Sequence, residues 1–131
     1  MHKVCWVSRH PPLKAQIDEL KRIFGKDTEI EQINKTFRDA KEVIEDVKKA
    51  GCDVAVVVAP LSMIAELLKD KDIKWIRAEM EALHMCRMPC EEFDESRDVW
   101  LPVAGEEEGR HMRFKEFREL VEVKVVTRPL E

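Results

Sequence analysis

The stretch Gly51–Ser62, GCDVAVVVAPLS, decides the fold. Residues 54–59 form an unbroken apolar run that is rich in β-branched valine and is bounded by Gly51 and Pro60. A run of this length and composition predicts a strand that is buried on both faces. Strands of this kind occur mainly in parallel sheets that carry helices above and below. We therefore expect an α/β protein built around this strand.

The residues before this strand alternate between predicted strands and predicted helices. Apolar side chains recur at helical spacing up to Gly25, a residue suited to closing a helix. Asp39 can cap a second helix, with Glu42 three positions later as in a capping box, and Gly51 can close it. The expected elements are a strand over 3–8, a helix over 13–24, an edge strand over 28–33 and a helix over 39–50.

The residues after the central strand predict one more helix and a more irregular second half. Ser62 can cap the third helix. Residues 73–83 fit either a helix or a strand, and the βαβ rhythm favours a fourth strand. Beyond them we expect an irregular loop over 84–97, a hairpin formed by 99–104 and 110–117, and a last strand over 121–127.

These elements predict a single α/β domain over residues 1–131. The first half reads as β-α-β-α-β-α-β, and right-handed crossovers leave few topologies for it. With the second strand at the edge, the strand order is 2-1-3-4 in a mostly parallel sheet. This order is typical of a Rossmann-like or flavodoxin-like fold. The C-terminal part would add an antiparallel hairpin and one more strand.

Composition excludes several classes of protein. The net charge of −4 argues against non-specific nucleic-acid binding, and no apolar run is long enough for a membrane span. The N-terminal residues lack the apolar core of a signal peptide, so we expect a cytoplasmic protein. Abundant charged residues with only three neutral amides are typical of a heat-adapted protein. The four glycines form no dinucleotide or phosphate-loop motif, so we expect no cofactor.

Polar residues follow several of the predicted strands. In open α/β sheets, ligands bind beyond the carboxyl ends of the strands, at the point where the strand order reverses. Arginine offers a planar fork of donors to a carboxylate or phosphate, and histidine can donate or accept a proton near neutral pH. The sequence therefore predicts a site for a small anionic, phosphate- or nucleotide-like ligand. Its candidate residues are Ser8, Arg9, His10, Asn34, Thr36 and Ser62.

A resemblance to known proteins supports the fold but adds no activity. Strand-Ser8-Arg9-His10, Thr36-Phe37, the segment 59–63 (APLSM) and the closing segment 126–130 (VTRPL) resemble a family of small, uncharacterised α/β proteins from prokaryotic genomes. The resemblance covers most of the chain and is weak over residues 84–105. It implies one domain and the same fold. The sheet with its C-terminal hairpin is also similar in outline to the nucleotide-sensing domains of CRISPR systems.

Two other functions remain open at this point. The apolar strand and the hairpin could instead seal a homodimer that acts as an interaction or regulatory subunit. Arg9-His10 also resembles the nucleophile segment of histidine phosphatases, which would make His10 the catalytic residue of a phosphoester hydrolase. That family has Gly after the histidine, and Pro11 stands there in this sequence.

Two of the cysteines could also belong to a metal site, which the sequence supports less than the functions above. His84, Cys86 and Cys90 form an H-x-C-x3-C pattern, and His111 could be a fourth zinc ligand. The compact C-x2-C pair of many zinc sites is absent, so we expect no metal. Cys5 and Cys52 lie in or beside predicted strands and are expected in the core. A structural disulfide is not expected in a cytosolic protein unless it comes from a hyperthermophile.

Overall fold

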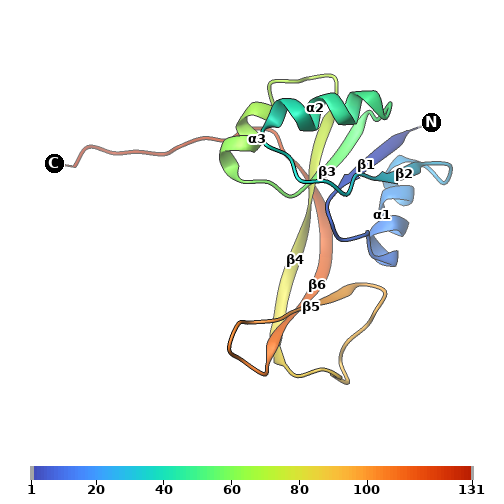
Figure 1. Ribbon diagram of the computed structural model, residues 1–131, viewed down its shortest axis with the longest axis vertical. Helices are drawn as coiled ribbons and strands as arrows, with labels where there is room; N and C mark the ends of the chain where they lie inside the picture. The colour runs from blue at the N-terminus through green and yellow to red at the C-terminus, as the bar shows by residue number, and fades with distance from the viewer. Residues whose placement is uncertain (1, 131) are drawn as a thin grey trace.

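The computed structural model describes residues 2–130 and contains three helices and six strands. The elements alternate through the first half of the chain and end in three strands (Figure 1). They are β1 (Lys3–Val7), α1 (Lys14–Phe24), β2 (Glu29–Gln32), α2 (Ala40–Lys49), β3 (Val54–Val57), α3 (Leu61–Leu67), β4 (Lys74–Cys86), β5 (Asp98–Leu101) and β6 (Gly109–Glu119).

The six strands form one mixed sheet of order β2-β1-β3-β4-β6-β5. The pairs β1–β2, β1–β3 and β3–β4 are parallel, whereas β4–β6 and β5–β6 are antiparallel. The α/β class and the hairpin are thus confirmed. The predicted order of four strands is incomplete, because β6 and β5 extend the same sheet beyond β4. The ambiguous residues 73–83 lie mainly in β4 and are strand rather than helix.

Helices cover both faces of the parallel strands. One core cluster joins Leu20 of α1 to Val4 and Trp6 of β1 and to Val54 and Val56 of β3. A second cluster on the opposite face packs α2 and α3 against Cys5, Val7, Ala55 and Val57. Because alternate residues of a strand point to opposite faces, the valine run supplies both clusters. No helix within residues 2–130 is long and apolar enough to cross a membrane.

The cap predicted for α2 is present in the structure, whereas the cap predicted for α3 is not. The Asp39 carboxylate accepts a hydrogen bond from the backbone N–H of Glu42 (3.0 Å) and so caps α2 as expected. The expected cap at Ser62 is wrong: α3 begins at Leu61, and the chain enters it through Pro60, whose fixed φ suits a helix start. Ser62 therefore lies inside the first turn and is exposed.

The expected strand over residues 121–127 is also wrong. Its alternating pattern is present, but residues 120–130 have no regular secondary structure. After the Leu120 backbone N–H donates to the Trp75 carbonyl (2.8 Å), the chain leaves the sheet and extends away from it (Figure 1). A strand needs a neighbour for its backbone groups, and β6 already lies between β4 and β5.

The second half of the sheet projects beyond the helices as an arm. Only the first residues of β4, Lys74–Ile76, pair with β3, whereas Ile76–Cys86 pair with β6. We use the name arm for residues 77–118. Figure 1 shows the long ribbons of β4 and β6 running away from α2 and α3 towards β5. The loop of the arm returns to the body where the Ala15 N–H donates to the Ser96 carbonyl (2.7 Å).

A disulfide joins Cys5 of β1 to Cys52, next to β3. Both residues are buried, as expected, but the disulfide between them was not expected for a cytosolic protein. The two Cα atoms are 5.8 Å apart, which is the usual separation for a disulfide. Because β1 and β3 are neighbours in the sheet, the fold brings the two thiols together without further adjustment.

We expect the disulfide to contribute strongly to stability. It links residues 47 positions apart, and closing a loop of that length in the unfolded chain corresponds to about 4 kcal/mol. The double variant Cys5→Ala/Cys52→Ala should therefore unfold at clearly lower denaturant than the parent. Chemical denaturation of both proteins without reductant measures this difference. Equal midpoints, with the parent shown by mass spectrometry to hold the bond, would contradict the expectation.

Candidate functional site

A cavity of about 350 Å³ opens at the carboxyl ends of β1 and β3. Because these strands are parallel neighbours, the segments that follow them meet at this edge of the sheet. The segment after β2 and the first turn of α3 complete the wall. The lining residues are Val7, Ser8, Arg9, Lys35, Thr36, Phe37, Val43, Val57, Val58, Ala59, Pro60, Met63 and Leu67.

The polar side of this cavity is cationic. The Arg9 guanidinium donates a hydrogen bond to the Thr36 hydroxyl, and both residues line the cavity. Lys35 lies 2.7 Å from a carboxylate oxygen of Asp46, and that contact raises its pKa. Among the described residues, no aspartate or glutamate lines the cavity, and no carboxylate pairs with Arg9. The positive charge of Arg9 is therefore available to a ligand.

Three of the six predicted binding residues line this cavity, namely Ser8, Arg9 and Thr36. His10, Asn34 and Ser62 are exposed and are not among the described residues that line it. The chain turns at His10, whose backbone N–H donates to the Ser8 hydroxyl (3.2 Å) and whose carbonyl accepts from the Trp6 indole (2.8 Å). Sequence reasoning missed Lys35, although its position beside Thr36 was a usable signal.

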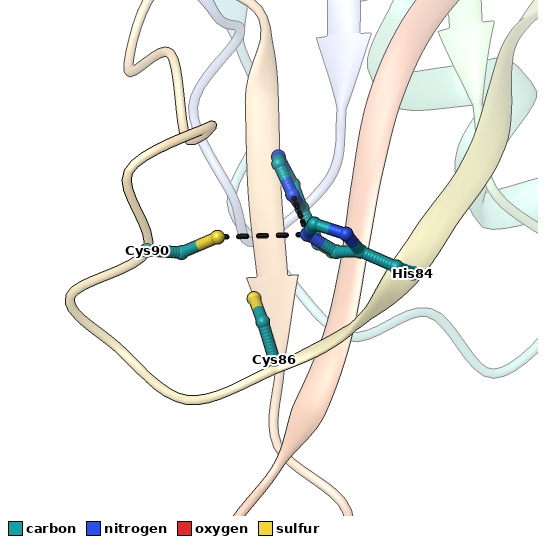
Figure 2. Close-up of side chains that lie close together, drawn as sticks. His84, Cys86 and Cys90 are labelled. Atoms are coloured by element: carbon teal, nitrogen blue, oxygen red, sulfur yellow. Dashed lines mark hydrogen bonds between the residues drawn. The ribbon is translucent and has the colours of Figure 1, made fainter.

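A second group of reactive side chains gathers on the arm. His84, Cys86, Cys90 and His111 each direct a nitrogen or sulfur atom to one point, and these four atoms lie within 4.8 Å of one another. His84 and Cys86 occupy alternate positions at the end of β4, and Figure 2 shows Cys90 approaching them from the loop. His111 comes from β6, where it is paired with His84 in the register of the sheet. The structure thus brings together all four residues that the sequence offered as possible zinc ligands, although no metal was expected there.

A buried hydrogen bond to Asp98 holds His111 in place. Its Nε2 atom lies 2.7 Å from an Asp98 carboxylate oxygen, and neither side chain is exposed to solvent. Arg113 donates to both oxygens of the same carboxylate, at 2.7 and 3.0 Å. Burial raises the pKa of Asp98, but the hydrogen bonds from Arg113 and His111 outweigh it and hold that pKa far below its ordinary value. His111 and Arg113 lie on the same face of β6. Sequence reasoning named His111 but missed Arg113, although this alternation was a usable signal.

The two cysteines of this group are free thiols. Burial, together with the neighbouring Cys90 thiol, raises the pKa of Cys86 to about 11. The backbone carbonyl of Cys86 accepts a hydrogen bond from the Trp100 indole (2.9 Å), which ties β5 to the end of β4. Gly109 is paired with Cys86 across the sheet, and the Trp100 ring lies directly against it.

Comparisons of this chain with protein-family models, with curated proteins and with solved structures find no match. The geometry of the two sites therefore carries the functional argument.

We expect Gly109→Ala to disrupt the end of the arm. An added Cβ would clash with the Trp100 ring and lie 2.6 Å from the Leu101 carbonyl oxygen, and overpacking of this kind costs about 1–3 kcal/mol. The melting temperature should fall, and the NMR signal of the Trp100 indole N–H should move or broaden.

Gly105→Ala is the matched control. Gly105 has a positive φ of 79°, so alanine is strained there by about 1–2 kcal/mol, but its Cβ would meet open space. This variant should lower the melting temperature without moving the Trp100 indole signal. If both variants leave that signal in place, the contact between Trp100 and Gly109 is wrong.

Proposed function

We propose that this protein binds a small anionic ligand, of phosphate or nucleotide-monophosphate type, in the cavity at the carboxyl ends of β1 and β3. The observation that carries the proposal is the placement of Arg9, held by Thr36, at a cavity with no acidic lining residue among those described. An arginine fork recognises a planar carboxylate or a phosphate through paired hydrogen bonds. The proposed fold is Rossmann-like, with the site at its switch point.

The remainder of the cavity favours a ligand that also has an apolar or planar part. Below Arg9 the wall is formed by the side chains of Phe37, Val57 and Met63. A volume of about 350 Å³ lies at the lower end of the range of about 300–1,000 Å³ that is usual for small-molecule sites. Free phosphate would leave most of this space unfilled, so a phosphorylated organic molecule is the better fit.

Binding has more support than catalysis at this site. A phosphoester hydrolase of the histidine type needs its histidine within hydrogen-bond reach of the phosphate. His10 is exposed, and only its backbone takes part in the turn that follows β1. Arg9 and Thr36 can hold an anion, but neither can act as a nucleophile's general base.

Homodimer formation is a second candidate function, favoured by the segment after Leu120. Val121 and Val125 belong to the alternating, strand-like pattern of residues 121–127, yet they are 69% and 84% exposed. A second copy of the chain could pair with this segment through its backbone groups. Light scattering should then give a dimer for the parent and a monomer for a chain that ends at Leu120. A monomeric parent at high concentration would remove this candidate.

We expect adenosine monophosphate to raise the melting temperature of the protein, because a ligand that binds only the folded state stabilises it. Arg9→Ala should weaken binding at least about tenfold, since a hydrogen bond to a charged group contributes about 1.5–3 kcal/mol. Titration calorimetry with adenosine monophosphate and with inorganic phosphate measures both effects. Phosphate should bind more weakly if the apolar wall contributes.

Arg22→Ala provides the matched control. Arg22 is also an exposed arginine, but it lies on α1 and pairs with Glu19. Its loss should leave binding unchanged. The proposal fails if neither compound changes the melting temperature of the parent, or if Arg9→Ala binds as tightly as Arg22→Ala.

A further inference from the structure

The four donor atoms on the arm lie close enough together to share one metal ion. In a zinc site, metal–nitrogen bonds of about 2.0–2.1 Å and metal–sulfur bonds of about 2.3 Å place tetrahedral ligand atoms about 3.3–3.8 Å apart. The Cys90 sulfur lies 3.5 Å from His84 Nε2, and His84 Nε2 lies 3.0 Å from His111 Nδ1. All four atoms fall within 4.8 Å of one another. One ion of this size would contact all of them after small side-chain rotations.

Each histidine turns its second ring nitrogen to a carboxylate. His111 Nε2 faces Asp98 at 2.7 Å, and His84 Nδ1 lies 3.4 Å from a Glu92 carboxylate oxygen. A neutral ring carries a single N–H, and in both rings the carboxylate favours that hydrogen on its own side. His84 Nε2 and His111 Nδ1, which face each other inside the cluster, then carry no hydrogen, and their lone pairs point towards each other. A cation between them turns this unfavourable contact into two bonds.

We propose that His84, Cys86, Cys90 and His111 bind one zinc ion. Two thiolates and two neutral imidazoles are a donor set that suits tetrahedral zinc, whereas calcium and magnesium require oxygen ligands. The two thiolate charges balance the double positive charge of the ion. The ion and its four ligands therefore add no net charge beside the buried His111. Binding displaces the two thiol protons to solvent.

The zinc ion is structural and connects three separate segments. His84 and Cys86 lie on β4, His111 lies on β6 and Cys90 lies in the loop that leads to β5. Four protein ligands leave no open position for a substrate, which is the pattern of structural rather than catalytic zinc. Cys90 is the single ligand from the loop, so the ion fixes this loop over the end of the arm. Asp98 and Arg113 act as positioning residues, because they orient the His111 ring.

The test measures the metal directly. Protein expressed with added zinc, purified with a non-chelating reductant and dialysed should contain one zinc ion per chain by elemental analysis. Replacement of zinc by cobalt should produce thiolate-to-cobalt charge-transfer absorption, and X-ray absorption should give two sulfur and two nitrogen ligands. Dialysed protein without zinc, or a metal shell without sulfur, would overturn the proposal.

Single substitutions separate this site from adventitious binding. Cys90→Ser and His84→Gln should each lower the zinc content well below that of the parent. Two matched controls should keep it: His10→Gln removes an exposed histidine outside the cluster, and Cys5→Ala/Cys52→Ala removes the other two cysteines. Zinc that is equal in the parent, in Cys90→Ser and in His84→Gln would overturn the proposal.

Hydrogen exchange keeps the proposal testable if a substitution impairs folding. In the parent protein, removal of zinc with a chelator should increase amide exchange at residues 87–97 more than in β1 and β3. Exchange that does not change on zinc removal would overturn the structural role. A Cys86–Cys90 disulfide, found by mass spectrometry in protein purified without reductant from zinc-supplemented cells, would overturn the site itself.

Discussion

The structure depends on the burial of both faces of β3. Val54, Ala55, Val56 and Val57 are each at most 3% exposed, and they alternate between the core beneath α1 and the core beneath α2 and α3. Because β3 pairs in parallel with β1 on one side and β4 on the other, this strand fixes the direction of both neighbours. The carboxyl ends of β1 and β3 then lie at one edge of the sheet, and β4 continues past that edge. The cavity and the arm both arise at that edge.

The arm is a direct consequence of this pairing. β4 runs parallel to β3 but continues for ten residues beyond Ile76, its last partner of β3. α2 and α3 pack against the parallel strands, and α1 reaches only as far along β4 and β6 as Met80 and Phe117. The far end of β4 therefore lacks the layers that bury β3. The proposed zinc ion would compensate for this loss, because a small lobe with few apolar contacts gains stability from a metal more readily than from a core. The buried side chains at this end of the arm are polar, namely Asp98 and His111, rather than aliphatic.

Much of the fold could be predicted because it depends on local patterns. The valine run, Gly25 and the Asp39 cap each act within a few residues, and Gly25 and Asp39 are confirmed. The predicted strand is confirmed for Val54–Val57 only, because β3 ends there and Val58 is 84% exposed. Ser62 and residues 121–127 were misread for different reasons. Pro60 competes for the start of α3, and an alternating pattern forms a strand only where a neighbour is free. The Cys5–Cys52 disulfide follows from the pairing of β1 and β3, which the predicted strand order contained. It was not predicted because a structural disulfide is unusual in a cytosolic protein.

The cavity and the cluster on the arm also differ in how much of each a local sequence pattern can predict. Ser8 and Arg9 follow β1 directly and Thr36 lies in the segment after β2, and the topology rule for parallel sheets placed these three at one cavity. The same rule also selected His10, Asn34 and Ser62, which are not among the described residues that line it. His84 and His111 are 27 positions apart and meet only through the antiparallel register of β4 and β6. The spacing of His84, Cys86 and Cys90 lacks the compact pair that makes a zinc site recognisable in a sequence. The sequence named all four residues as possible ligands but could not show that they meet. The register of β4 and β6 aligns the two histidines, and the loop brings the Cys90 sulfur to them, so the proposed zinc site depends on sheet topology.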